Sequence, residues 1–93
     1  MSARLSGLTI GALTLDPTFD PDVTVYTANT TNATNTVTAT PEDESAEVTI
    51  LNGETPVENG TAATWTDGAN TLTITVKNGN AQMIYTVTVT KSS

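Results

Sequence analysis

The sequence contains no cysteine and no histidine among its 93 residues. Without cysteine, disulfides, thiolate metal sites and cysteine nucleophiles are excluded. Without histidine, imidazole general bases, serine triads of the usual kind and most transition-metal sites are excluded as well. Carboxylates alone would have to supply all acid–base chemistry, and no pocket motif accompanies them. We therefore predict that the protein is not an enzyme, has no catalytic residues and uses no cofactor.

Basic residues are scarce too, because three Lys and Arg stand against ten Asp and Glu and give a formal net charge of −7. Such a chain repels phosphates and anionic lipid headgroups, so we expect no nucleic-acid partner. No apolar run approaches the roughly 18 residues of a membrane span, so we expect no membrane insertion. The stretch MSARLSGLTIG lacks the charged start and continuous apolar segment of a secretory signal. If this were the whole natural chain, we would expect no export through a cleaved signal.

Threonine is abundant instead, with 22 of the 93 residues. It alternates with branched aliphatic residues in TLTITVK, residues 71–77, and in YTVTVT, residues 85–90. A period of two is typical of a strand with one buried and one exposed face. Between the two runs, Asn78-Gly79-Asn80 offers residues that tolerate the positive φ angles of a tight turn. The two runs are therefore predicted to form an antiparallel hairpin.

Five further segments are predicted as strands from the same alternation and from the turn residues between them: residues 4–15 (broken near Gly11), 23–28, 35–40, 47–51 and 62–66. No segment shows a sustained helical period. Turn signals recur every 8–12 residues or so, which favours a sandwich. The sequence predicts an all-β, antiparallel β-sandwich of about seven strands, in a single domain over residues 1–93 with its core in residues 5–91.

Three stretches carry a resemblance to a known family: LSGLTIGALTLDPTFDPDVTVYT, DGANTLTITVKNG and the closing YTVTVTK. Their order and spacing resemble those of the cadherin-like β-sandwich domains of bacterial surface proteins and phage structural proteins. The resemblance covers residues 5–91, nearly the whole chain. It implies an Ig-like sandwich, and it implies no catalytic residues because the family has none to carry over.

Asp16, Asp20 and Asp22 lie within seven residues of one another and are the candidate metal ligands. Calcium would need six to eight oxygen ligands, and the acidic run 42–44 could lie near the three aspartates. The spacing is not that of an EF-hand loop, and the acidic inter-repeat motifs of true cadherins are missing. The alternative is a turn, in which aspartate side chains accept backbone N–H groups. We favour the turn over the calcium site.

Six residues of the chain support the turn or the core. Pro17 and Pro21 preset φ in the segment of the aspartates, and Phe19 is expected to pack under the sandwich as a plug. Trp65 could be a platform for stacking a sugar, but a lone tryptophan in an Ala/Thr strand more often fills the core. Two tyrosines, Tyr26 and Tyr85, are expected to be buried with their hydroxyls on backbone acceptors.

Three classes of function remain. We favour a structural or display module on the surface of a phage virion, which stabilises the particle or makes weak contacts with the host surface. The alternative is an adhesion or accessory repeat of a larger secreted bacterial protein, located outside the cell or on its surface. An enzyme is the third class and the least supported. The expected partners are neighbouring proteins in the virion or in a multidomain surface protein, with a weak carbohydrate contact as a further possibility.

Overall fold

A computed structural model describes residues 2–92 of the chain. It contains eight β-strands: β1 (Leu5–Ile10), β2 (Val25–Thr30), β3 (Thr34–Pro41), β4 (Glu47–Asn52), β5 (Thr55–Val57), β6 (Thr61–Thr64), β7 (Gly68–Asn78) and β8 (Ala81–Lys91). None of these described residues forms a helix, so none forms a helix long and apolar enough to cross a membrane. The all-β prediction is confirmed. The end residues 1 and 93 of the predicted domain lie outside the described part.

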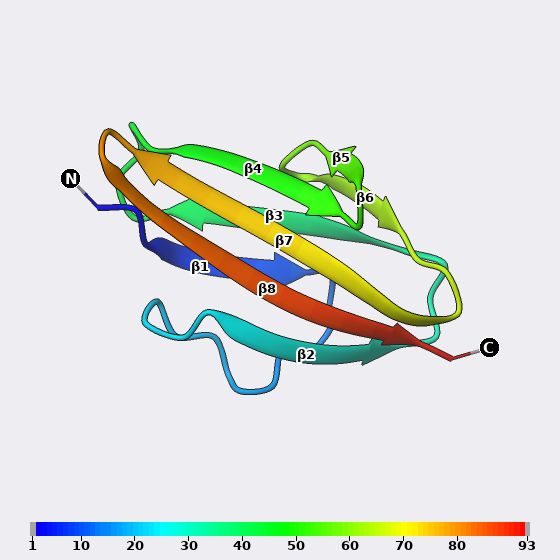
Figure 1. The fold of residues 1–93 in the computed structure, drawn as a ribbon. Coiled ribbons are helices and arrows are strands. Elements are labelled where there is room, and N and C mark those ends of the chain that lie inside the picture. Colours follow the sequence, from blue (N-terminus) through cyan, green and yellow to red (C-terminus); the bar gives the residue numbers. More distant parts are fainter. Residues whose placement is uncertain (1, 93) are drawn as a thin grey trace.

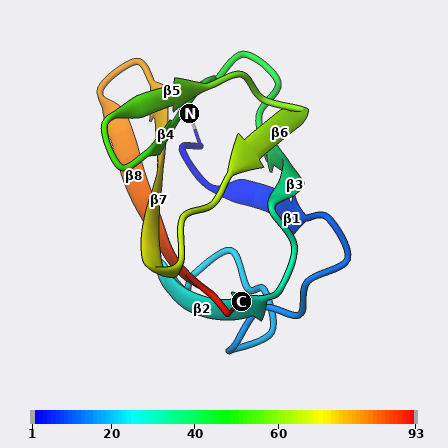
Figure 2. The ribbon, with the colours of Figure 1, turned by 90° about the vertical axis from the view of Figure 1, so that its right-hand side faces the viewer.

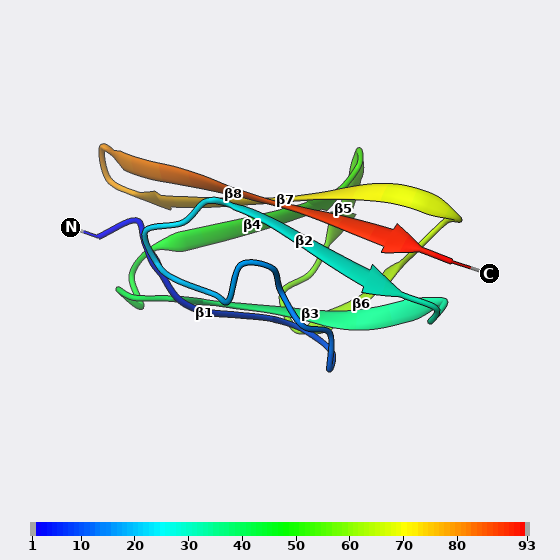
Figure 3. The same cartoon turned by 90° about the horizontal axis from the view of Figure 1, so that it is seen from below.

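The strands form two sheets that pack face to face (Figure 1). One sheet has the order β1-β3-β6 and the other has the order β2-β8-β7-β4-β5. Figure 3 shows the two layers edge-on, and Figure 2 shows the chain crossing from one to the other between β5 and β6. The molecule measures 42 × 24 × 17 Å, and its two termini lie at opposite ends of the long axis. The predicted sandwich is confirmed.

The five-stranded sheet is mixed, which differs in one pairing from the antiparallel arrangement that we predicted. Strand β2 runs parallel to β8 over six residue pairs, while the other strand pairs are antiparallel. The reason is that β1 belongs to the three-stranded sheet, and the long connection 11–24 carries the chain back along the molecule before β2 joins the other sheet. Alternation identifies a strand and its buried face, but it carries no information about a partner distant in sequence.

The β7–β8 hairpin forms as predicted, with Asn78 and Ala81 as the last pair before a two-residue loop. Gly79 has a φ of 60°, and no residue other than glycine has a positive φ among the described residues. Glycine at the first loop position followed by a residue of negative φ is the pattern of a type II′ turn, which suits the twist of a hairpin. Only Gly79, and not its asparagine neighbours, uses the left-handed region.

Several strand ends differ from the prediction, and one strand was missed. The first predicted strand ends early, at Ile10, and β2 covers Val25–Thr30 rather than 23–28. The predicted strand 62–66 ends at Thr64, so Trp65 follows the strand instead of lying within it. Strand β5 was missed because it has only three residues and contains Pro56. Proline cannot donate to a ladder, so in the middle of a strand it is typical of a sheet edge, which is where β5 lies.

The core lies between the two sheets and follows the alternation of the strands. Its buried apolar residues are Ala3, Leu5, Leu8, Ile10, Leu15, Tyr26, Ala28, Val37, Ala39, Ile50, Ala63, Trp65, Leu72, Ile74, Val76, Tyr85, Val87 and Val89. Leu72, Ile74 and Val76 of β7 and Tyr85, Val87 and Val89 of β8 contribute as predicted, whereas Met83 is only half-buried. The burial of these side chains is the main favourable term for folding.

Charged residues are almost absent from the strands. The eight strands contain only Glu47, Lys77 and Lys91, and the first two of these are cross-strand partners. Since Glu47 is the only strand acid among ten acidic residues, the other nine lie in the connections. The outward positions of the strands are mostly threonine, with Val25 and Ile84 as exposed apolar residues. The two broad faces are therefore nearly uncharged, and the acidic charge is carried by the loops.

Candidate functional site

The loop that carries the three aspartates is held to the sandwich by Tyr26. The Tyr26 hydroxyl donates to the Asp20 carbonyl at 2.6 Å and accepts the Asp20 N–H at 3.0 Å. Burial raises the pKa of the Tyr26 phenol, and the hydrogen bond to the Asp20 backbone acts in the opposite direction. The phenol therefore stays protonated at neutral pH and can serve as both donor and acceptor.

The second tyrosine fixes the neighbouring residue of the same loop. The Tyr85 hydroxyl donates to the Pro21 carbonyl at 2.7 Å and accepts the Leu5 N–H at 3.0 Å. The Phe19 ring packs near both tyrosine rings, with its centroid 5.8 Å from that of Tyr26 and 6.5 Å from that of Tyr85. It is partly buried against the core. The predictions of two buried tyrosines with backbone acceptors and of Phe19 as a plug are confirmed.

The three aspartates have separate contacts. The Asp20 carboxylate accepts the Asp22 N–H at 2.9 Å, which closes a local turn of the kind predicted. The Asp22 carboxylate pairs with the Arg4 guanidinium. The Asp16 backbone exchanges two hydrogen bonds with Thr27, at 2.9 and 2.8 Å, and its side chain is exposed. Each aspartate thus makes a separate contact, and the three side chains do not converge on a common point.

The second acidic run lies at the same end of the sandwich but is organised independently. The Asp43 carboxylate accepts the Ser45 N–H at 3.0 Å, the Ser45 hydroxyl at 2.7 Å and the Asn78 amide at 2.9 Å. These contacts, led by the Ser45 N–H, lower the pKa of the Asp43 carboxyl. Arg4 stands between the two acidic segments, because its carbonyl accepts the Glu42 N–H while its side chain pairs with Asp22.

No group of three or more acidic side chains in residues 2–92 is arranged to hold a metal ion. The proposed ligands Asp16, Asp20 and Asp22 are exposed, and the run 42–44 does not join them. The turn contacts of Asp20 are observed directly. The absence of calcium binding at this loop stays a prediction.

Trp65 is a core residue, since only 4% of its surface is exposed. Its indole Nε1 donates to the Asn35 Oδ1 at 2.9 Å, and its backbone N–H donates to the Ala33 carbonyl at 2.9 Å. A buried indole satisfied in this way cannot stack on a sugar. The core interpretation of Trp65 is therefore confirmed, and a carbohydrate contact would have to use other residues.

Asparagine side chains fix several connections, and sequence reasoning did not identify them. Asn70 bonds to Thr66, Gly68 and Val89 and so wraps the turn before β7. Asn59 bonds to both the N–H and the carbonyl of Ala39, so its side chain takes the place of a strand beside β3. A signal was available for Asn70, which lies in DGANTLTITVKNG, one of the three stretches that carry the resemblance. None was available for Asn59, because the position of its partner depends on the fold.

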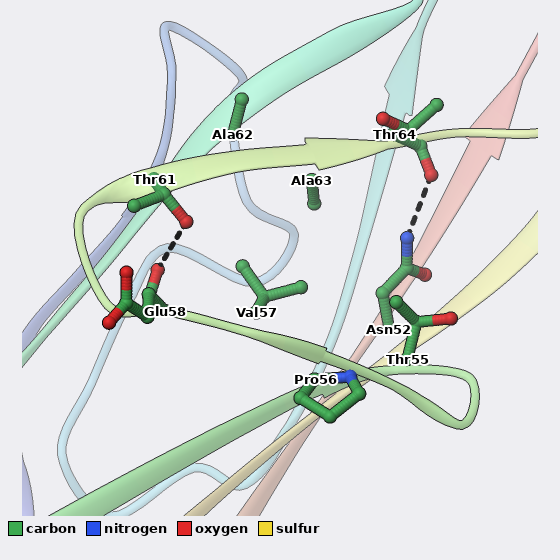
Figure 4. A pocket seen from close by; sticks show the side chains of 9 residues that line it. All are labelled: Asn52, Thr55, Pro56, Val57, Glu58, Thr61, Ala62, Ala63 and Thr64. Carbon is green, nitrogen blue, oxygen red and sulfur yellow. Dashed lines mark hydrogen bonds between the residues drawn. The ribbon is translucent and has the colours of Figure 1, made fainter.

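A hollow of about 410 Å³ opens where the edges of the two sheets meet (Figure 4). Its lining comes from the β4–β5 hairpin on one side and from β6 on the other: Asn52, Thr55, Pro56, Val57, Glu58, Thr61, Ala62, Ala63 and Thr64. The Asn52 amide crosses it and donates to the Thr64 carbonyl at 2.8 Å. Its lining holds one carboxylate, two small apolar residues of β6 and no cation, which suits binding by shape and backbone rather than chemistry on a substrate.

The arrangement of strands and the comparison with known proteins lead to the same assignment. The chain matches the model of the cadherin-like β-sandwich domain over residues 5–92. No curated protein matches the chain in sequence. The matched region includes all eight strands and the loop braced by Tyr26 and Tyr85. With a two-layer sandwich over the same residues, the chain belongs to the family of cadherin-like β-sandwich domains.

Proposed function

We propose that this cadherin-like β-sandwich is a non-catalytic display module on the surface of a phage virion, where it stabilises the particle or makes weak contacts with the host surface. The family indicates a structural or adhesion-type module. The observation that carries the proposal is the distribution of charge. The broad faces are nearly uncharged threonine surfaces, and the acidic loops surround them. Such an exterior resists aggregation and leaves contacts weak, because interfaces depend on buried aromatic or arginine anchors.

The test is to image intact virions of the phage that encodes the chain with an antibody raised against the purified domain. We expect label on the head or tail, and we expect it to disappear when the antibody is first absorbed with the domain. Capsid or tail genes beside the coding sequence would agree with this outcome. Virions that carry no label would overturn the proposal.

An adhesion or accessory repeat of a larger secreted bacterial protein is the second candidate. The observation in its favour is that the two chain ends lie at opposite ends of the 42 Å axis, which suits domains joined end to end. The same antibody would then label intact, unpermeabilised bacterial cells and leave virions unlabelled. In either setting the expected partners are neighbouring proteins, with a weak carbohydrate contact as a further proposal.

A further inference from the structure

The free edge of β6 is the feature that the display function does not use. Strand β6 is the last strand of the three-stranded sheet, and β3 is its neighbour on the other side. The seven-strand Ig sandwich has a four-stranded sheet, with one further strand beyond the position that β6 occupies here. In this chain the strand that precedes β6, β5, pairs with β4 in the other sheet instead. Within residues 2–92 that position has no strand. The sandwich therefore presents an open place for one strand.

The direction of the backbone groups of β6 follows from its register with β3. Trp65 N–H donates to Ala33, and Ala63 is paired with Asn35 in the same register. Hydrogen-bonded and non-bonded pairs alternate in an antiparallel ladder, so Ala62 and Thr64 direct their N–H and carbonyl groups away from β3. The Thr64 carbonyl accepts the Asn52 amide. The Ala62 groups and the Thr64 N–H are directed to the free edge.

The hollow beside β6 is shaped for an added strand. Figure 4 shows the Val57 side chain between the two strands, facing β6, and Ala63 facing it from the other side. Val57 is half-buried and packs on the core, and only 1% of Ala63 is exposed. Inward side chains of an added strand would rest on this apolar floor. The 410 Å³ hollow gives room for a few such side chains.

Strand β5 forms the opposite edge of the hollow, and it is a poorer acceptor for an added strand than β6. Strand β5 contains Pro56, which has no N–H and so blunts the edge of the five-stranded sheet. Strand β6 has the sequence TAAT, with no proline and no charge. An incoming strand can form main-chain hydrogen bonds with β6 but not a continuous ladder with β5.

The charge around the hollow specifies the occupant. Glu54 and Glu58 are exposed on the connections on either side of β5, and Glu58 lines the hollow. No Lys or Arg lines it. A second copy of the chain would bring another net charge of −7 and a second Glu58 to the same edge, which opposes self-pairing. A strand flanked by Lys or Arg would instead be attracted.

We propose that the free edge of β6 accepts an extended, Lys- or Arg-flanked segment of a partner protein by strand addition. The main chain of Ala62 and the Thr64 N–H provide the hydrogen bonds, the hollow takes inward side chains, and Glu54 and Glu58 select the charge. Main-chain bonds of this kind give affinity, and the pockets for alternate side chains give specificity. The inference does not depend on whether the domain is displayed on a virion or on a cell.

The experiment titrates the isotope-labelled domain with a synthetic peptide of alternating threonine and valine, about six residues long, with a lysine at each end. Binding is followed by NMR, and amide exchange is measured with and without peptide. We expect shift changes centred on Thr61–Thr64 and Val57, and slower exchange at Ala62 and Thr64. Changes centred on another edge or on the broad faces, or no binding at all, would overturn the proposal.

Two proline variants test whether the main-chain hydrogen bonds of β6 contribute to peptide binding. Ala62→Pro removes an N–H that faces the free edge, and proline is tolerated there, so the domain should keep its fold. We expect it to weaken peptide binding by about tenfold. The matched control is Asn29→Pro on the edge strand β2, where the N–H also faces away from the sheet, and it should bind like the parent. Equal affinity of parent and Ala62→Pro would contradict strand addition.

Two further comparisons test the charge and the occupant. A peptide with glutamate in place of both lysines should bind more weakly, and Glu58→Gln should reduce the preference for the lysine peptide together with its salt dependence. Equal binding of the two peptides would contradict the assigned charge selectivity. Sedimentation of the domain alone should show a monomer. A dimer whose contacts map to Thr61–Thr64 would mean that a second copy, and not a partner strand, occupies the edge.

Discussion

The buried indole of Trp65 and the amide of Asn35 form one unit at the residue scale. The amide oxygen accepts the indole N–H at 2.9 Å and also receives the Thr30 hydroxyl at 3.4 Å. Asn35 also lies 2.7 Å from the point where a side chain on Gly11 would begin, so a larger residue at Gly11 would strike it. Packing and hydrogen bonding around Trp65 therefore depend on each other.

Replacing Trp65 by alanine should destabilise the domain by about 3–5 kcal/mol, because the cavity adds to the lost burial. A domain of this size has a total stability of roughly 5–15 kcal/mol, so the variant should lose a large share of it and unfold at a clearly lower denaturant concentration. Chemical denaturation of the parent and of Trp65→Ala measures the difference. Trp65→Phe is the control, since it keeps most of the apolar ring and should lose less. A cost below about 1 kcal/mol for the alanine variant would show that the ring is not a core residue.

The Asp43 carboxyl should make the stability of the domain depend on pH. Its hydrogen bonds to Ser45 and Asn78 lower the pKa of the folded carboxyl below its unfolded value, which is about 3.9. The stabilisation is therefore present above the unfolded pKa and is lost as the pH falls through the folded pKa. Asp43→Asn should be less stable than the parent near neutral pH, and the difference should shrink below about pH 4. Urea unfolding across this pH range measures it, and a difference that grows toward low pH would contradict the assignment.

At the scale of elements, the connection 11–24 is held mainly by contacts that do not need negative charge. Tyr26 and Tyr85 bind backbone groups of Asp20 and Pro21. The one ion pair, Asp22 with Arg4, is exposed, with 75% of the Asp22 side chain accessible. Exposed pairs contribute only about 0–1 kcal/mol. The conformation of the loop should therefore survive removal of its carboxylate charges.

Calcium provides the test of the loop. We expect millimolar calcium to shift the melting temperature by less than about 2 °C, because separate surface carboxylates gain only screening. A specific site would behave differently, since calcium at 100 times its Kd adds about 2.7 kcal/mol of stability to the native state. In a domain of this size that would raise the melting temperature by roughly 10 °C or more. Scanning calorimetry with and without calcium measures the shift.

The control replaces Asp16, Asp20 and Asp22 by asparagine, which keeps the side-chain oxygen and removes the charge. The triple variant should melt within a few degrees of the parent, with the lost Arg4 pair as the main difference. It should be equally indifferent to calcium. A large calcium-dependent rise in the parent that vanishes in the triple variant would make the loop a metal site.

Individual elements show how far the sequence could predict the fold. The β7–β8 hairpin was predictable because its alternation, its turn and its partner are all local. The tyrosine contacts were predictable in kind, since a buried hydroxyl requires a partner. The β2–β8 pairing and the Asn59 contact with Ala39 were not predictable, because each joins segments distant in sequence. The free edge of β6 was not predictable for the same reason, because the periodicity of a strand does not indicate the order of strands in a sheet.

At the scale of the whole molecule, charge and apolar surface are separated. The acidic loops lie at the ends and along one rim of the sandwich, and the nearly uncharged threonine faces lie between them. Two exposed apolar side chains, Val25 at 64% and Ile84 at 47%, lie on the outer face of the five-stranded sheet. Val25 pairs with Thr86, two residues from Ile84 on the same face, so the two side chains form one small apolar pair, which is normal on a protein surface. Repulsion between the acidic loops should keep copies apart near neutral pH.

The parallel pairing of β2 with β8 has a mechanical consequence. The chain ends lie at opposite ends of the long axis. A pull on the N-terminus loads β1 first and then, through the connection 11–24, pulls β2 in the direction opposite to the pull on β8. The hydrogen bonds of the six residue pairs then share the force in shear instead of opening one by one. Single-molecule pulling should find that Ala28→Pro, which removes an N–H directed at β8, lowers the unfolding force more than Asn29→Pro, whose N–H faces away. Equal forces for the two variants would contradict this load path. Through this load path, the domain should resist a force that is applied along the chain.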